Sequence, residues 1–215
     1  MMRSRNTFLF TLLAAALHAP AHAAPSCAAY AGELAAMVEA ADAVRSRVDY
    51  LAAPEDAAAA RQRADLETVE RGNAERLSAW MAACGWPRRS VEGVQAARAA
   101  WLVAQQRSSD VAFQRQVVRQ LELAVLDGEA SAMHLASASD RLAVQEGRPQ
   151  RYGTQLRQVA GCGWDYYQLD DPARVEARRR RLGLPSLEEH RRTINAAVTV
   201  QHCTAPLSDS LSNNG

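Results

Sequence analysis

The chain has 215 residues, with 25 basic and 24 acidic side chains and a formal net charge of +1 at pH 7. All 25 basic residues are arginine, which excludes Schiff-base chemistry and a phosphate-loop lysine. The hydrophobic fraction of 48% is typical of a globular protein with a core. A charge this close to neutral argues against a dedicated nucleic-acid binder.

Residues 1–23 are typical of a secretory signal peptide. Arg3 and Arg5 precede an uncharged, mostly apolar segment at 8–17, and a small-x-small cleavage site ends at Ala23. The apolar segment is shorter than the roughly 20 residues that cross a bilayer, although an N-terminal anchor helix stays open as an alternative. We expect cleavage after Ala23, a periplasmic or secreted protein, and no transmembrane segment once the signal is removed.

The chain contains four cysteines, Cys27, Cys84, Cys162 and Cys203. An even number in an exported chain favours two disulfides, and three pairings are possible. We favour Cys84–Cys162 together with Cys27–Cys203, because the second pair lies in the two terminal extensions. There is no CxxC spacing and no histidine at zinc-finger spacing, so we predict neither a metal site nor a cofactor.

Helical periodicity dominates the first part of the chain. Apolar residues recur at three- and four-residue spacing over 34–51 and again over 66–84, on either side of Pro54. This pattern predicts an antiparallel helical hairpin within residues 24–85.

The chain is expected to be one domain with terminal extensions, in which residues 86–200 form a mainly α domain with a β-hairpin. Ser90, Asp110 and Ser131 are the expected N-caps of a third, fourth and fifth helix. The sequence as a whole predicts an antiparallel pack of about seven helices, stapled by disulfides.

The helical pattern stops near Arg148. Two β-prone runs within 154–169 predict a small β-hairpin with a Gly-rich turn. Asp171-Pro172 is typical of a helix start, and Ser186 with Glu189 forms a capping box for a seventh helix. Residues 201–215 are expected to be a flexible tail.

Two glutamines interrupt the apolar helix faces. Gln105 lies about 40° from Trp101 on the third helix, and Gln114 lies on the inward arc of the fourth. A buried amide without partners costs about 1–3 kcal/mol, so we expect both to bond with the irregular segment 147–155. That segment is then either a ligand-contacting loop or a structural loop that satisfies the two amides.

Several motifs in fixed order resemble a bacterial family, the domain-of-unknown-function family 6624, over about residues 86–190. They are Gly85-Trp86-Pro87, Ser90, Ala100-Trp101-Leu102, Gln105, Asp110, Phe113-Gln114, Asp140-Arg141, Gly147, Pro149-Gln150, Tyr152-Gly153-Thr154-Gln155, Gly183-Leu184-Pro185 and Leu187. The resemblance implies no known activity. Members typically carry Gln-His after the tryptophan, whereas this chain has Gln106 at the second position, so any proton chemistry of that histidine would be absent here.

From these features we predict a non-enzymatic binding or interaction domain with a polar pocket near the Tyr-Gly-Thr-Gln loop. The partner would be a small polar or anionic ligand or another protein, and not a nucleic acid. The expected ligand-binding residues offer amides, hydroxyls, an indole and one guanidinium: Trp101, Gln105, Gln114, Arg141, Gln150, Tyr152, Thr154 and Gln155.

The alternative is a periplasmic hydrolase that uses Tyr152 or His134 together with Asp140 or Arg141. No nucleophile signature or glycine-rich phosphate loop supports it. The basic run 178–181 is expected to be a solvated helix with salt bridges to Glu188 and Glu189, although contact with an anion or a lipid headgroup is also open.

Overall fold

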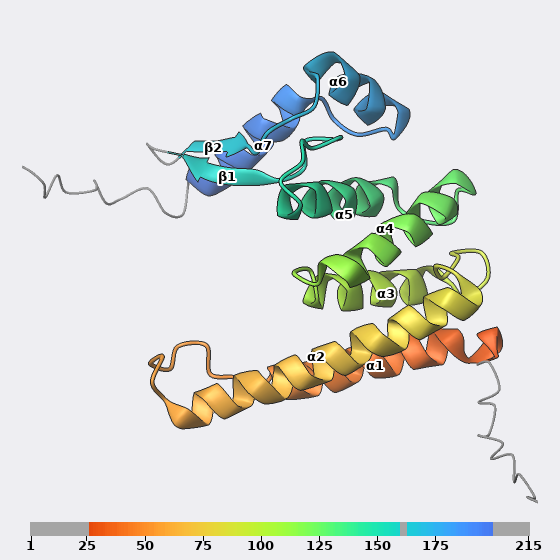
Figure 1. The fold of residues 1–215 in the computed structure, drawn as a ribbon, viewed down its shortest axis with the longest axis vertical. Helices are drawn as coiled ribbons and strands as arrows, with labels where there is room; N and C mark the ends of the chain where they lie inside the picture. Colours follow the sequence, from red (N-terminus) through yellow and green to blue (C-terminus); the bar gives the residue numbers. More distant parts are fainter. Residues whose placement is uncertain (1–25, 160–162, 200–215) are drawn as a thin grey trace, which may run out of the picture.

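The computed structural model describes residues 26–159 and 163–199. Seven α-helices and one two-stranded hairpin make up this part of the chain, as expected from the sequence (Figure 1). The elements in chain order are η1 (Cys27–Ala29), α1 (Tyr30–Arg45), α2 (Ala57–Cys84), α3 (Val94–Gln106), α4 (Val111–Leu126), α5 (Ala132–Gln145), β1 (Leu156–Val159), β2 (Gly163–Tyr166), α6 (Pro172–Arg181) and α7 (Leu187–Thr199).

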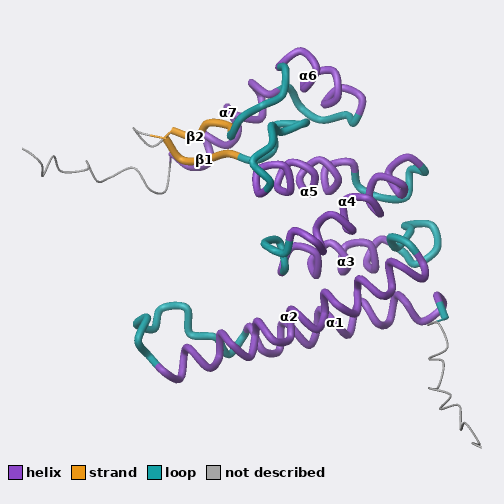
Figure 2. Tube along the Cα trace, viewed as in Figure 1, coloured by secondary structure: helices purple, strands orange, loops and turns teal. Residues whose placement is uncertain are grey.

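The elements are stacked in the order in which they occur along the chain. The α1–α2 hairpin forms one end, α3, α4 and α5 lie in the middle, and the β-hairpin with α6 and α7 forms the other end (Figures 1 and 2). Buried apolar side chains from α1 to α5 form one continuous core. The N-terminal hairpin therefore shares its core with the helices that follow it.

Local sequence explains how the first hairpin forms. Asp56 caps α2 by accepting hydrogen bonds from the amides of Ala58 and Ala59. Asn73, on the buried face of α2, donates from Nδ2 to the carbonyl of Met37 at 2.7 Å, so its amide holds α1 in place. The first helix ends at Arg45, earlier than its apolar periodicity suggests, and residues 46–56 form the connection.

A disulfide joins Cys27 to Cys84, so the predicted pairs Cys84–Cys162 and Cys27–Cys203 are wrong. The physical reason is the hairpin itself. Because α1 and α2 run antiparallel, the start of the first helix lies beside the end of the second, and the two Cα atoms are 5.8 Å apart. Cys162 and Cys203 lie outside the described residues.

Most expected helix caps are present. Asp110, Ser131 and Asp171 each accept a hydrogen bond from a backbone amide in the first turn of the helix that follows. Ser186 and Glu189 form the expected capping box at the start of α7.

Ser90 is not a cap, contrary to expectation. Gly93, with a φ of 91°, precedes α3, and the hydroxyl of Ser90 donates instead to Glu129 at 2.6 Å. The loop before α3 is thereby tied to the turn between α4 and α5.

The β-hairpin is shorter than predicted. β1 and β2 pair antiparallel, with Leu156 opposite Tyr166. The hydroxyl of Tyr166 donates to the carbonyl of Leu187 at 2.8 Å, which fixes the hairpin against α7. No described helix combines the length and the apolar character needed to cross a bilayer.

Candidate functional site

The loop that follows α5 folds around the side chain of Asp140. This carboxylate is fully buried. Its Oδ1 accepts from the amides of Arg151 at 2.8 Å and Tyr152 at 3.0 Å, and its Oδ2 accepts from the amide and the hydroxyl of Thr154 at 2.9 and 3.0 Å. Burial raises the pKa of Asp140, while these donors oppose the rise. Asp140 thus fixes the shape of the loop.

Gln150 closes the same loop on itself. Its buried amide accepts at Oε1 from the amides of Thr154 and Gln155, at 3.1 and 2.8 Å. Its Nε2 donates to the carbonyls of Gln155 and Tyr167, both at 3.0 Å. All four hydrogen-bonding positions are in use, so the side chain has a structural role.

Arg179 holds the other side of the loop. Its buried guanidinium donates from Nη1 to the carbonyls of Tyr152 at 2.6 Å and Gly153 at 3.0 Å, and from Nε to the carbonyl of Pro185. The peptide groups of Tyr152 and Gly153 therefore lie between a carboxylate on α5 and a guanidinium on α6.

The sequence analysis missed this role of Arg179. The expected salt bridges from the run 178–181 to Glu188 and Glu189 do not form: Arg178 pairs with Asp170 at 2.7 Å. Four consecutive arginines cover every side of a helix, so one of them must face inward when the helix packs. The arginine run in the sequence was therefore the signal that could have predicted a buried arginine in this helix.

The two amides of the predicted polar interior do not meet the loop. Gln114 is buried, but its Nε2 donates to the carbonyls of Ala104 and Arg107 at the end of α3. Gln105 is exposed. Around the axis of α3, Trp101 lies about 100° from the buried Ala100, at the edge of the buried face. Gln105 lies a further 40° around the axis, on the face exposed to solvent.

This difference gives a paired prediction. Gln114→Leu should lower the free energy of unfolding by about 1–3 kcal/mol, because the helix end loses a buried donor. Gln105→Leu should change it by less than about 0.5 kcal/mol, as is usual for exposed positions. Equilibrium unfolding in urea measures both, and equal effects would contradict the assigned burial.

A pocket of about 480 Å³ lies between α3, the loop before it and the start of α5. Trp86, Trp101 and Leu102 contribute apolar walls. The ring of His134 stacks on Trp101, with centroids 4.3 Å apart and planes 6° apart. Burial lowers the pKa of His134, so this ring is neutral at pH 7.

The charged side chains that line this pocket are Arg89 and Arg98, and Arg89 donates to the carbonyl of Gly128. Arg141 lies seven residues after His134, within about 20° of it around α5. Within the described residues neither Arg98 nor Arg141 makes a hydrogen bond or an ion pair. α3 contains no acid, and the only acid of α5 is Asp140, whose oxygens the loop occupies. We call the α3–α5 surface that carries Arg98, Trp101, His134 and Arg141 the α3–α5 seam.

Within the described residues, no hydrogen bond joins the side chains of the hydrolase alternative to one another, although the amide of Tyr152 donates to Asp140. Asp140 bonds to the loop, and His134 stacks on Trp101. Neither hydrogen bonds to the hydroxyl of Tyr152, which has no partner in the described part of the chain. Nothing in this arrangement favours acid–base catalysis by these groups.

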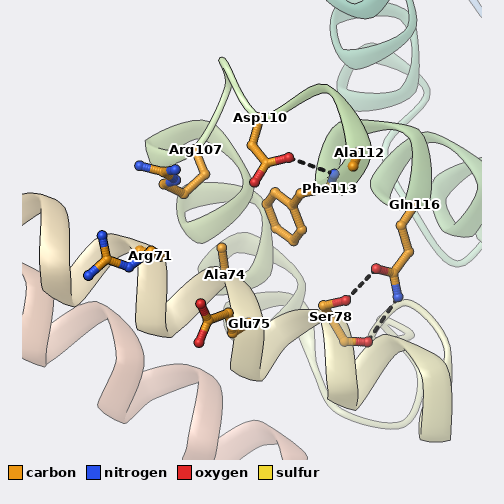
Figure 3. A pocket seen from close by; sticks show the side chains of 9 residues that line it. All are labelled: Arg71, Ala74, Glu75, Ser78, Arg107, Asp110, Ala112, Phe113 and Gln116. Carbon is orange, nitrogen blue, oxygen red and sulfur yellow. Dashed lines mark hydrogen bonds between the residues drawn. The ribbon is translucent and has the colours of Figure 1, made fainter.

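Another pocket, of about 460 Å³, lies where α2 meets the connection between α3 and α4 (Figure 3). Gln116 bonds to both the hydroxyl and the carbonyl of Ser78 at one side of it. Arginines and carboxylates both line this pocket, so it selects for neither sign of charge. Among residues 26–159 and 163–199, no three His, Cys, Asp or Glu side chains gather as metal ligands.

The fold and this geometry define a small, mainly α domain with a disulfide between Cys27 and Cys84, a buried polar corner and a surface pocket lined by arginines. The chain belongs to a family of unknown function, DUF6624, which it matches over residues 29–202. The match begins in the N-terminal hairpin, well before the residues that carried the resemblance. No curated protein and no solved structure matches the chain.

Proposed function

We propose that the chain is an exported, non-enzymatic binding domain whose ligand lies on the α3–α5 seam. The ligand would be an anion that carries an aromatic or aliphatic body. One observation carries the proposal: a pocket with two tryptophans in its wall is lined by Arg98, which has no side-chain partner within the described residues, and the single acid of α3 and α5 is fully occupied.

The chemistry of the seam supports this ligand class. Tryptophan faces bind flat or apolar groups, and a guanidinium without a partner binds a carboxylate or a phosphate. Gln105 is exposed on α3, and Gln155 bonds to the carbonyl of Ser137 on α5. Of the predicted ligand residues, Trp101, Gln105, Arg141 and Gln155 stay in the proposed site. Gln114, Gln150 and Thr154 are assigned to the framework by their hydrogen bonds.

Export is part of the proposal. The signal-like residues 1–23 lie outside the described part of the chain. The disulfide between Cys27 and Cys84 supports an oxidising compartment, because such bonds are rare in a reducing cytosol. Mass spectrometry of the exported protein should find an N-terminus at Ala24.

Binding can be tested with phenylacetate and its neutral analogue phenylacetamide. By isothermal titration calorimetry, phenylacetate should bind more tightly than phenylacetamide. Arg98→Gln and Arg141→Gln should each weaken phenylacetate binding by about fivefold, which is the usual effect of losing one partly buried charge contact.

Arg61→Gln is the matched control, because Arg61 is exposed in the first turns of α2. Figure 1 shows that this end of α2 lies away from α3 and α5. This variant should bind phenylacetate like the wild type. Equal affinity for the acid and the amide, or an equal loss in the Arg61 variant, would contradict the proposal.

A further inference from the structure

A separate cavity of about 530 Å³ lies between the second half of α4, the start of α5 and the end of α6, and it shares no lining residue with the pocket on the α3–α5 seam. Its walls are aliphatic side chains from α4, from α5 and from the residue that follows α6: Leu123, Val125, Leu126, Leu135 and Leu182. Leu126 is 83% exposed. Leu123 is 60% exposed, whereas Leu135 is buried. Neighbouring exposed leucines mark a binding surface more often than scattered ones do.

Tyr152 places a hydroxyl at this cavity. Its side chain lines the cavity and is only 8% exposed, and the hydroxyl makes no hydrogen bond within the described residues. Its backbone is held on both sides, because Asp140 accepts from the amide and Arg179 donates to the carbonyl. The backbone from which the ring projects is therefore fixed, and the hydroxyl is available to donate to a ligand.

The cavity lining carries one guanidinium and one carboxylate, and the carboxylate is paired with a guanidinium from outside the lining. Arg119 lines it and has no ion-pair or hydrogen-bond partner in the described part of the chain. Glu122, the only acid in the lining, already lies 3.7 Å from a guanidinium nitrogen of Arg151. A hydroxyl donor and a free guanidinium beside an apolar wall are complementary to a carboxylate with a hydrocarbon tail.

We propose that this cavity binds an aliphatic carboxylate, with the carboxylate between the Tyr152 hydroxyl and Arg119 and the chain against the leucines. A flat apolar face of another protein fits less well, since it would bury the hydroxyl without an acceptor. This site is independent of the ligand site proposed on the α3–α5 seam.

The test uses decanoate as the probe, with the neutral analogue 1-decanol, in calorimetric titrations of the purified protein. Decanoate should bind more tightly than decanol. Tyr152→Phe and Arg119→Gln should each weaken decanoate binding by about fivefold, and Leu126→Ser by about tenfold. Leu51→Ser is the matched control, because Leu51 is 97% exposed in the connection between α1 and α2, and it should change nothing.

Three results would overturn the proposal. Decanol could bind as tightly as decanoate, the Leu126 variant could bind decanoate like the wild type, or Arg98→Gln could weaken decanoate as much as Arg119→Gln does. The last result would place decanoate on the α3–α5 seam instead. Sedimentation velocity adds a further check: a concentration-dependent dimer that Leu126→Ser abolishes would make a second copy of the chain the occupant.

Discussion

Asp140→Asn should lower the free energy of unfolding by about 2–3 kcal/mol, although the substitution leaves the size of the side chain nearly unchanged. Asp140 accepts four hydrogen bonds with two oxygens. An asparagine has one oxygen, and its NH₂ group would face a buried donor of Arg151, Tyr152 or Thr154. An unsatisfied buried donor costs about 1–3 kcal/mol, and the loss of charge weakens the bonds that remain. Urea unfolding followed by circular dichroism measures the change.

Asp127→Asn is the control for this experiment. Asp127 is exposed just after the end of α4, where neutralising the carboxylate should change stability by less than about 0.5 kcal/mol. If the two variants unfold at the same urea concentration, the loop is not held by the carboxylate of Asp140.

Arg179→Met should have an effect of similar size, about 3 kcal/mol. Methionine keeps much of the aliphatic stem, but the carbonyls of Tyr152, Gly153 and Pro185 lose their donor. Hydrogen bonds to a charged group contribute about 1.5–3 kcal/mol each, and some of the loss is recovered if water reaches the carbonyls.

Arg180→Met, one residue along the same helix, provides the matched control for Arg179. Arg180 is exposed and has no side-chain partner within the described residues. Thermal unfolding should leave this variant close to the wild type and lower the melting temperature of the Arg179 variant by several degrees. Equal melting temperatures would show that the arginine run acts only through its net charge.

Local rules predicted much of the fold. Each of the caps at Asp110, Ser131 and Asp171 depends on one side chain and the backbone amides two or three residues later, which a sequence displays directly. The sequence predicted the β-hairpin within 154–169, but the observed strands are shorter than predicted. The amides of Thr154 and Gln155, just before β1, donate to Asp140 and Gln150 and so are not available to extend the ladder.

The pairing of Cys27 with Cys84 could be predicted only from the arrangement of the helices in space, and not from local sequence patterns. An antiparallel hairpin was predicted, and that prediction alone places the residue before the first helix beside the end of the second. The predicted pairs Cys84–Cys162 and Cys27–Cys203 rest instead on position along the chain, because Cys27 and Cys203 lie in the two terminal extensions. Geometry of predicted elements is therefore a better guide to pairing than sequence separation is.

The candidate site was predicted only in part, because burial at a helix edge changes within a few tens of degrees. Gln105 and Gln114 looked equivalent on a helical wheel, yet one is exposed and the other is bonded to the end of α3. Gln150, Asp140 and Arg179 form the buried polar corner because distant segments meet there. Their pairing depends on tertiary contacts that no local pattern contains.

The conformation of the bend at Tyr152 and Gly153 is fixed by residues that lie before and after it in the chain, and not by the bend alone. Asp140 precedes it and Arg179 follows it by more than two dozen residues. During synthesis, the bend leaves the ribosome before Arg179, which holds its carbonyl groups, has been added to the chain. The bend therefore reaches its final conformation only once Arg179 has been added, and a fragment that stops before Pro172 would carry Tyr152 without the contact that orients it.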